Sequence, residues 1–148
     1  MKNHSIISLV VLLFAAAIPV ALGADKAASC PVTRSVQANA PREAGVSPLS
    51  GTWHINADRS IWALTQVWRA GITNKEPWFR PANVQLVVTG HRLDGTAPAL
   101  KVTVAGIYAT RFQATGMEFP VAGCWEVTGK AGDKELHFIT KVEPSHVP

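Results

Sequence analysis

The feature that most restricts the fold is a series of short alternations of apolar and polar residues that begins at Val84. Residues 84–89 and 100–104 each place one set of apolar side chains on a single face, and glycine and proline residues separate such segments. This two-residue period is typical of half-buried β-strands. Because no helical pattern competes after residue 70, we expect an all-β fold, either a single β-sandwich or a small barrel.

Two details refine the pattern towards the C-terminus. Residues 123–129 and 135–142 flank a short loop with Gly132 and Asp133 in turn positions, which predicts a β-hairpin. In the preceding strand, the apolar phase changes on either side of Gly116, and we interpret this glycine as the site of a bulge.

Residues 51–82 are harder to interpret, although they carry four of the five tryptophans. Alternation over residues 53–55 predicts a short strand, followed by a turn at residues 56–60. Residues 61–68 fit either a strand with a kink or a short helix, because periodicity does not separate the two for so short an apolar run. We expect residues 70–77 to form a loop.

The N-terminal end is typical of a secretory signal peptide. It has a positive charge at Lys2, an apolar run over residues 6–20 and small residues up to Gly23. An uncleaved membrane anchor is the main alternative, since the run is close to the roughly 18 apolar residues that could span a bilayer. A lipid-attachment site at Cys30 is disfavoured, because charged residues separate that cysteine from the apolar run.

These patterns divide the chain of 148 residues into three parts. Residues 1–23 form the predicted signal peptide. Residues 24–50 are rich in Ala, Ser and Pro without a sustained period, and we expect an irregular arm. Residues 51–148 form the predicted β-sandwich domain, and the mature chain is long enough to bury its own core.

The two cysteines, Cys30 and Cys124, both remain after cleavage. An even pair in an exported protein predicts a disulfide, which would pin the arm onto a late strand and cover an edge or one end of the sandwich. As a catalytic nucleophile, Cys124 would need a neighbouring base and a positive environment. Instead, Glu126 lies on the same strand face, and its carboxylate opposes formation of a thiolate.

Charge argues against nucleic acid as a partner. The net charge is +4, and loss of Lys2 with the signal peptide would leave +3. Basic residues are scattered among acidic ones and form no run that would follow a phosphate backbone. We therefore expect no nucleic-acid partner, and no stable membrane span after cleavage.

No catalytic constellation is evident. The chain lacks a G-x-S-x-G elbow and a glycine-rich phosphate loop, and no rule brings its carboxylates together in a cleft. His54, His91 and His137 lack the close spacing that zinc ligands typically show, so we predict no metal site and no cofactor. We expect His54 and His137 on exposed strand faces.

The remaining candidate is an aromatic and basic cluster at Trp78, Phe79 and Arg80, which we place in a loop. Exposed Trp and Arg side chains are typical binding anchors for sugars or peptide side chains. Alternatively, Trp78 or Phe79 closes one end of the sandwich, since a small core uses its large aromatic residues first. We expect Trp125 in the core.

Several short motifs of this chain occur together in one family of proteins. They are Phe119-Pro120, the Gly-Cys-Trp-Glu-Val-Thr-Gly motif at 123–129, Gly132-Asp133, Leu136, Phe138, the Cys-Pro-Val-Thr motif at 30–33 and the Lys-Glu-Pro-Trp-Phe-Arg motif at 75–80. In these motifs the chain resembles a family of small, exported, uncharacterised bacterial proteins. The resemblance covers most of residues 75–142 and implies an immunoglobulin-like sandwich outside the cytoplasm, with no assigned activity.

Together these observations predict a secreted or periplasmic, non-enzymatic binding or envelope module. Its partner would be a protein, a carbohydrate or another envelope ligand. The alternative is an exported enzyme or metal-binding protein whose site is assembled from distant residues such as His54, His91 and His137.

Overall fold

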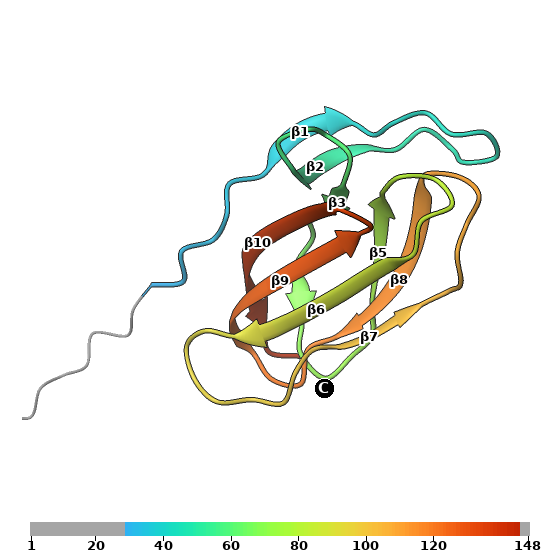
Figure 1. Cartoon of the computed structure of the whole chain (residues 1–148). Coiled ribbons are helices and arrows are strands. Elements are labelled where there is room, and N and C mark those ends of the chain that lie inside the picture. Colours follow the sequence, from blue (N-terminus) through green and yellow to red (C-terminus); the bar gives the residue numbers. More distant parts are fainter. Residues whose placement is uncertain (1–28, 146–148) are drawn as a thin grey trace, which may run out of the picture.

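The computed structural model describes residues 29–145, which form two β-sheets packed face to face (Figure 1). The described part contains no helix, and therefore none that is long and apolar enough to cross a membrane. The predicted signal peptide, residues 1–23, lies outside the described residues. The prediction of an all-β sandwich is confirmed, and the immunoglobulin-like expectation is met at the level of two packed sheets.

The larger sheet has six strands and the smaller sheet has four. All neighbouring strands are antiparallel except β4 and β10, which pair in parallel. In spatial order, the six-stranded sheet contains β1 (Val36–Asn39), β2 (Ser50–Ile55), β3 (Trp62–Leu64), β5 (Asn74–Phe79), β8 (Phe112–Glu118) and β7 (Lys101–Val104). The four-stranded sheet contains β4 (Trp68–Arg69), β10 (Lys134–Glu143), β9 (Gly123–Ala131) and β6 (Leu86–Arg92).

The predicted hairpin is present as β9 and β10. Ala131 pairs with Lys134, so the loop contains only Gly132 and Asp133. Gly132 has a φ of 62°, a left-handed conformation that glycine adopts without steric cost. This hairpin forms the centre of the smaller sheet (Figure 1).

Three local predictions need correction. Residues 61–68 form neither one kinked strand nor a helix, because β3 and β4 belong to different sheets. Residues 74–79, predicted mostly as loop, form the central strand β5. Gly116 is not at a bulge, because β8 pairs with β5 in unbroken register through this position. The arm is also more regular than expected, since Val36–Asn39 forms β1.

The core between the sheets is built mainly from aromatic rings. Phe119 lies edge-on to both Trp68 and Trp125, with ring centroids 5.5 and 5.4 Å apart. Trp78 of the larger sheet packs against Phe138 and covers Gly129 of the smaller sheet so closely that a Cβ at Gly129 would collide with its indole ring. The absence of a side chain at this glycine therefore allows the sheets to approach each other.

A second aromatic cluster lies on the outer face of the six-stranded sheet. It consists of Trp53, Trp62 and Phe79, all almost fully buried. Arm residues cover it, including Ala38, whose carbonyl accepts a hydrogen bond of 3.0 Å from the indole of Trp53. Without this cover, three large aromatic side chains would be exposed to water.

The predicted disulfide joins Cys30 to Cys124, with Cα atoms 5.3 Å apart. Beside it, the amide of Thr33 donates to the carbonyl of Ile139, and the Thr33 hydroxyl accepts from the Ile139 amide. The arm therefore covers part of the outer edge of β10, as predicted, and protects it from pairing with another chain.

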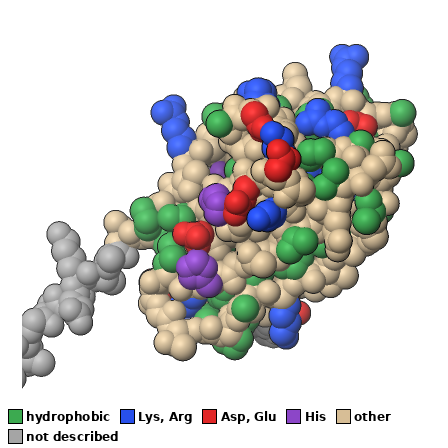
Figure 2. Space-filling view, in the orientation of Figure 1, with side chains coloured by type: hydrophobic (Ala, Val, Ile, Leu, Met, Phe, Trp, Pro, Cys, Tyr) green, Lys and Arg blue, Asp and Glu red, His purple; other side chains and the backbone are tan. Residues whose placement is uncertain are grey.

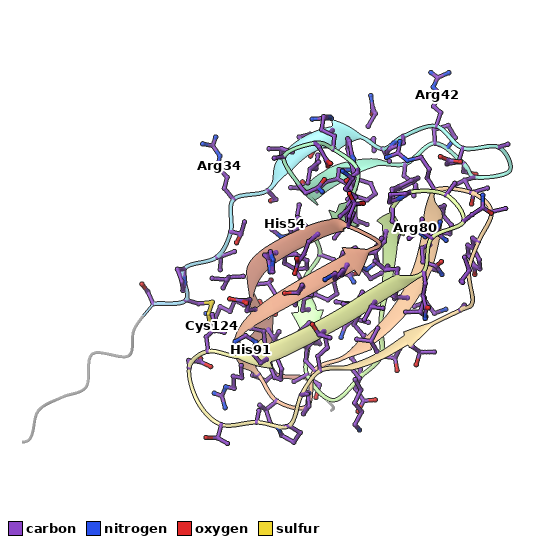
Figure 3. The ribbon with its side chains drawn as sticks, in the orientation of Figure 1. Arg34, Arg42, His54, Arg80, His91 and Cys124 are labelled. Atoms are coloured by element: carbon purple, nitrogen blue, oxygen red, sulfur yellow. A yellow bond between two sulfur atoms is a disulfide. The ribbon has the colours of Figure 1, made fainter. Side chains whose placement is uncertain are left out.

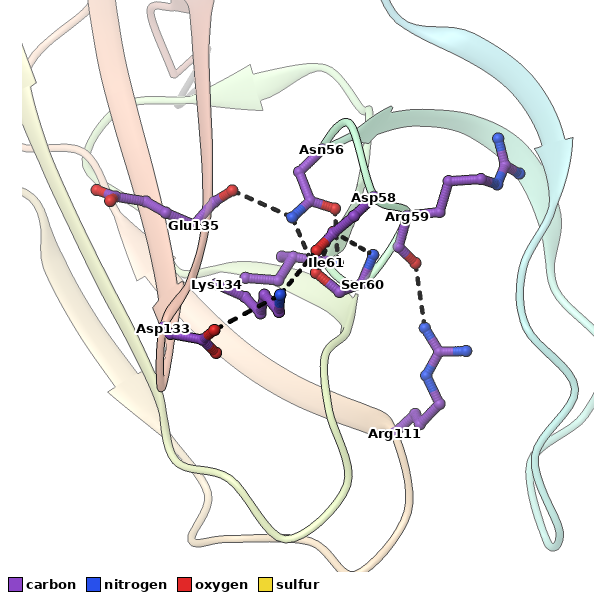
Figure 4. Close-up of polar contacts among 9 residues, drawn as sticks. All are labelled: Asn56, Asp58, Arg59, Ser60, Ile61, Arg111, Asp133, Lys134 and Glu135. Atoms are coloured by element: carbon purple, nitrogen blue, oxygen red, sulfur yellow. Dashed lines mark hydrogen bonds and ion pairs between the residues drawn. The ribbon is translucent and has the colours of Figure 1, made fainter.

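A polar network fastens the turn after β2 to the start of β10 (Figure 4). Asn56 donates to the carbonyl of Glu135, and the Lys134 ammonium lies 3.1 Å from the carboxylate of Asp58. A hydrogen bond from Ser60, followed by the one from Lys134, lowers the pKa of Asp58 to about 2. The ammonium of Lys134 neutralises this carboxylate. Because the turn follows β2 of the larger sheet and Lys134 begins β10 of the smaller sheet, these contacts connect the two sheets.

The disulfide should contribute a large share of the stability, because it closes a loop with a sequence separation of 94. Replacing both cysteines (Cys30→Ala with Cys124→Ala) is expected to lower the free energy of unfolding by about 4 kcal/mol in the chain-entropy view. Urea unfolding followed by tryptophan fluorescence measures the change. Reduced wild-type protein is the control and should unfold at the same urea concentration as the double variant. Alkylation of either cysteine in the native protein without reduction would contradict the crosslink.

Candidate functional site

The predicted binding anchor is buried. Trp78 and Phe79 lie on β5 rather than in a loop, and Arg80 follows directly, with exposed fractions of 0%, 1% and 0%. Because successive side chains on a strand point to opposite faces, Trp78 enters the core between the sheets and Phe79 enters the outer aromatic cluster. The prediction that these three residues are exposed is therefore wrong: Trp78 and Phe79 are buried aromatic residues on β5, and Arg80 is buried as well.

Arg80 has a structural role (Figure 3). Its guanidinium donates to the carbonyls of Pro81, Tyr108 and Thr110 and to the side-chain oxygen of Gln113, at 2.8–2.9 Å. Burial lowers the pKa of this group, which nevertheless stays charged in proteins. The contacts hold the segment between β7 and β8 against the sheet.

His54, His91 and His137 lie on three different strands, and Figure 3 labels the first two. His54 is on β2 and is buried, contrary to expectation, whereas His91 on β6 and His137 on β10 are exposed. The described residues contain no group of three or more His, Cys, Asp or Glu side chains placed to hold a metal ion. On the face in Figure 2, where the four-stranded sheet lies in front, acidic and basic side chains are interspersed.

The environment of His54 is apolar. Its ring stacks on Phe138 with centroids 4.3 Å apart and planes 9° from parallel. Neither ring nitrogen has a hydrogen-bond partner, and burial lowers the pKa of His54 to about 4. The imidazole is therefore neutral at pH 7 and behaves as an aromatic core residue.

The structure does contain a candidate site that the sequence did not reveal. An apolar groove of about 570 Å³ lies on the outer face of the six-stranded sheet, over β5, β8 and β7. Its lining side chains alternate with the residues that face the core and therefore belong to the outer face. The outward residues are Thr73, Lys75, Pro77, Thr103, Ala105, Phe112, Ala114 and Gly116, and the groove is also bordered by Glu76 and Thr115, which are buried.

The small residues of β8 make this surface concave. Gly116 and Ala114 occupy the strand between β5 and β7, where larger side chains would fill the space. Phe112, the next outward residue on β8, forms the end of the groove and packs edge-on against Phe79, with centroids 5.8 Å apart. The groove therefore begins where the arm-covered aromatic cluster ends.

A buried carboxyl group, that of Glu76, lies on the inner face of β5, opposite the groove. Glu76 is 1% exposed, and one of its oxygens accepts a hydrogen bond of 2.9 Å from Gln66 while the other has no partner. Burial raises the pKa of Glu76 well above its ordinary value, and the hydrogen bonds from Leu64 and Gln66 counteract this only in part. The side chain is therefore a neutral acid over part of the pH range in which an exposed glutamate is ionised.

One sequence signal could have revealed the groove. The change of apolar phase in residues 112–119 does not mark a bulge at Gly116. It arises instead because Phe112 and Ala114 point outwards while Met117 and Phe119 point into the core, so the outer face of β8 carries apolar side chains opposite a buried face that also contains Gln113 and Thr115. Apolar side chains on the outward face of a strand indicate a face that can be covered or can bind a ligand.

Comparison with protein-family models, curated proteins and solved structures gives no match to this chain. The function is therefore argued from the geometry of the site alone.

The buried acid should make stability depend on pH. Because its folded-state pKa is raised, Glu76 disfavours the folded state as pH rises above the unfolded value near 4.5. Glu76→Gln is expected to raise the free energy of unfolding at pH 7 by more than about 1 kcal/mol, with a smaller gain at pH 4.5. Urea unfolding at both pH values tests this. Glu126→Gln, at a partly exposed position on β9, is the control and should show no such pH-dependent gain.

The contribution of His54 to stability should change with pH in the opposite direction to that of Glu76. Its lowered folded-state pKa means that stability is complete above pH 6.5 and is lost as pH falls towards 4, by up to about 1.4 kcal/mol per pH unit. His54→Phe keeps an aromatic ring against Phe138 and should remove this loss. His91→Phe, at an exposed position, should leave it unchanged. Equal acid sensitivity of the wild-type and His54→Phe proteins would show that His54 is not the responsible group.

Proposed function

We propose that this protein is a secreted or periplasmic, non-enzymatic binding module that takes an apolar ligand in the groove over β5, β8 and β7. The observation that carries the proposal is the groove itself, which has about 570 Å³ of mostly apolar, uncovered space. Small-molecule sites usually have volumes of roughly 300–1,000 Å³ and mostly apolar walls. Exposed apolar depressions of this kind commonly mark interaction sites.

Export rests on separate support. The Cys30–Cys124 disulfide is typical of oxidising compartments, where such bonds persist. The N-terminal charge and hydropathy pattern and the resemblance to exported bacterial proteins point in the same direction. We include membership of that family, and a role in the bacterial envelope, in the proposal.

A binding role accounts for the site better than catalysis does. Catalysis needs a nucleophile, base or metal within reach of the bound substrate. The outward side chains of the groove are hydroxyl, aliphatic, aromatic and a single ammonium, and Glu76, which borders it, is only 1% exposed because its side chain is buried. His54, His91 and His137, the residues of the alternative enzyme or metal-binding hypothesis, are not among the lining residues.

The test uses Nile red, a neutral dye whose fluorescence rises in apolar surroundings. Wild-type protein should bind it, and Ala114→Trp, which fills the groove, should weaken binding at least about tenfold by removing most of the apolar contact area. Thr89→Trp places the same side chain on the exposed face of β6 and is the matched control. Equal binding by all three proteins, or no binding by wild type, would contradict the groove as a site for apolar ligands.

A further inference from the structure

The polarity of the groove changes in a regular way along the strands. One row across the sheet contains Lys75, Gly116 and Thr103, since Gly116 pairs with both of the others. The next row contains Pro77 paired with Ala114 and is apolar. The third row brings Phe112, so the groove has a polar end and an aromatic end. At about 3.3 Å per residue, the distance from the first row to the third is roughly 13 Å.

The charge at the polar end is uncompensated. Lys75 is exposed and has no ion-pair partner among residues 29–145. The other ammonium on this part of the sheet, Lys101, is paired with Glu118 at 3.1 Å. The row that contains Lys75 also provides the Thr103 hydroxyl, which can donate a hydrogen bond. The polar end thus has donors and one free positive charge, without a carboxylate to neutralise it.

We propose that the groove binds a free amphiphilic anion, with its headgroup at Lys75 and Thr103 and its apolar body over Ala114 towards Phe112. This inference rests on the proposed function and specifies its ligand class. A carboxylate or another oxyanion matches the ammonium and the hydroxyl, which are both exposed and flank Gly116, with the Thr73 methyl group close to this glycine. The apolar rows then bury the body of the ligand.

The two ends contribute differently to binding. Affinity comes mainly from the apolar area removed from water, which scales with the length of the ligand chain. The ion pair at Lys75 is solvent-exposed, so it adds selectivity of about fivefold rather than most of the affinity. Added salt should reduce this selectivity, because mobile ions screen exposed charges.

The experiment compares decanoate with decanol by displacement of Nile red, below the concentrations at which either aggregates. Wild-type protein should bind decanoate about fivefold more tightly than decanol. Lys75→Gln should abolish the preference, and Lys75→Arg should retain it. Lys130→Gln removes an exposed charge from β9, on the other sheet, and should have no effect. Urea unfolding of each variant verifies that the fold is intact.

The outcomes separate the inference from the proposed function. If both compounds bind wild type equally, or if Lys75→Gln keeps the preference for decanoate, the inference is wrong while the apolar groove stands. If Nile red binds but neither compound displaces it, the inference is wrong, and if Nile red itself does not bind, both proposals fail. Sedimentation of the protein with phosphatidylglycerol vesicles, without binding of monomeric decanoate, would identify a membrane surface as the partner and overturn the inference.

Discussion

Both faces of the six-stranded sheet carry apolar side chains, although only one face packs against the smaller sheet. On the inner face, Trp78 covers Gly129 and forms the contact between the sheets. On the outer face, neighbouring residues of the same strands present Phe79, Pro77 and their cross-strand partners. Because exposed apolar area is costly in water, the outer face requires either a cover or a ligand. The arm covers one part of this outer face, and the other part remains open as the groove.

The arm covers only part of this face. It is fixed at one end by the Cys30–Cys124 disulfide and the bonds between Thr33 and Ile139, and further along by the pairing of β1 with β2. Its apolar residues Ala38, Ala40 and Leu49 then pack on the outer aromatic cluster, and none of them lines the groove. A segment with so little regular structure of its own would gain little by folding alone. Its order therefore depends on the crosslink and on the aromatic surface beneath it.

The sequence predicted those elements in which period, turn chemistry and burial agree. The β9–β10 hairpin combines alternation with a Gly-Asp turn, and Cys124 within it had one possible intramolecular partner. Strand β5 was missed because Lys75, Glu76 and Pro77 have low strand propensity, and because tertiary contacts override propensity in a central strand. Its Pro77 is tolerated although β5 has a neighbour on each side. The groove was missed for a different reason: alternation reports which residues share a face but does not report whether that face is covered.

The polar residues of the larger sheet show how strictly strand alternation separates structural and binding roles. Lys75 and Glu76 are adjacent in sequence, yet one is exposed at the groove and the other is enclosed in the core with one oxygen unpaired. If the register of β5 shifted by one residue, the ammonium would be buried, Glu76 would lie at the groove and Trp78 would leave Gly129. Burial of the ammonium and separation of Trp78 from Gly129 are both unfavourable, so the packing of Trp78 helps to fix the register of β5. The same register sets the order of polar, apolar and aromatic rows in the groove, and the core thereby determines what the outer face can bind.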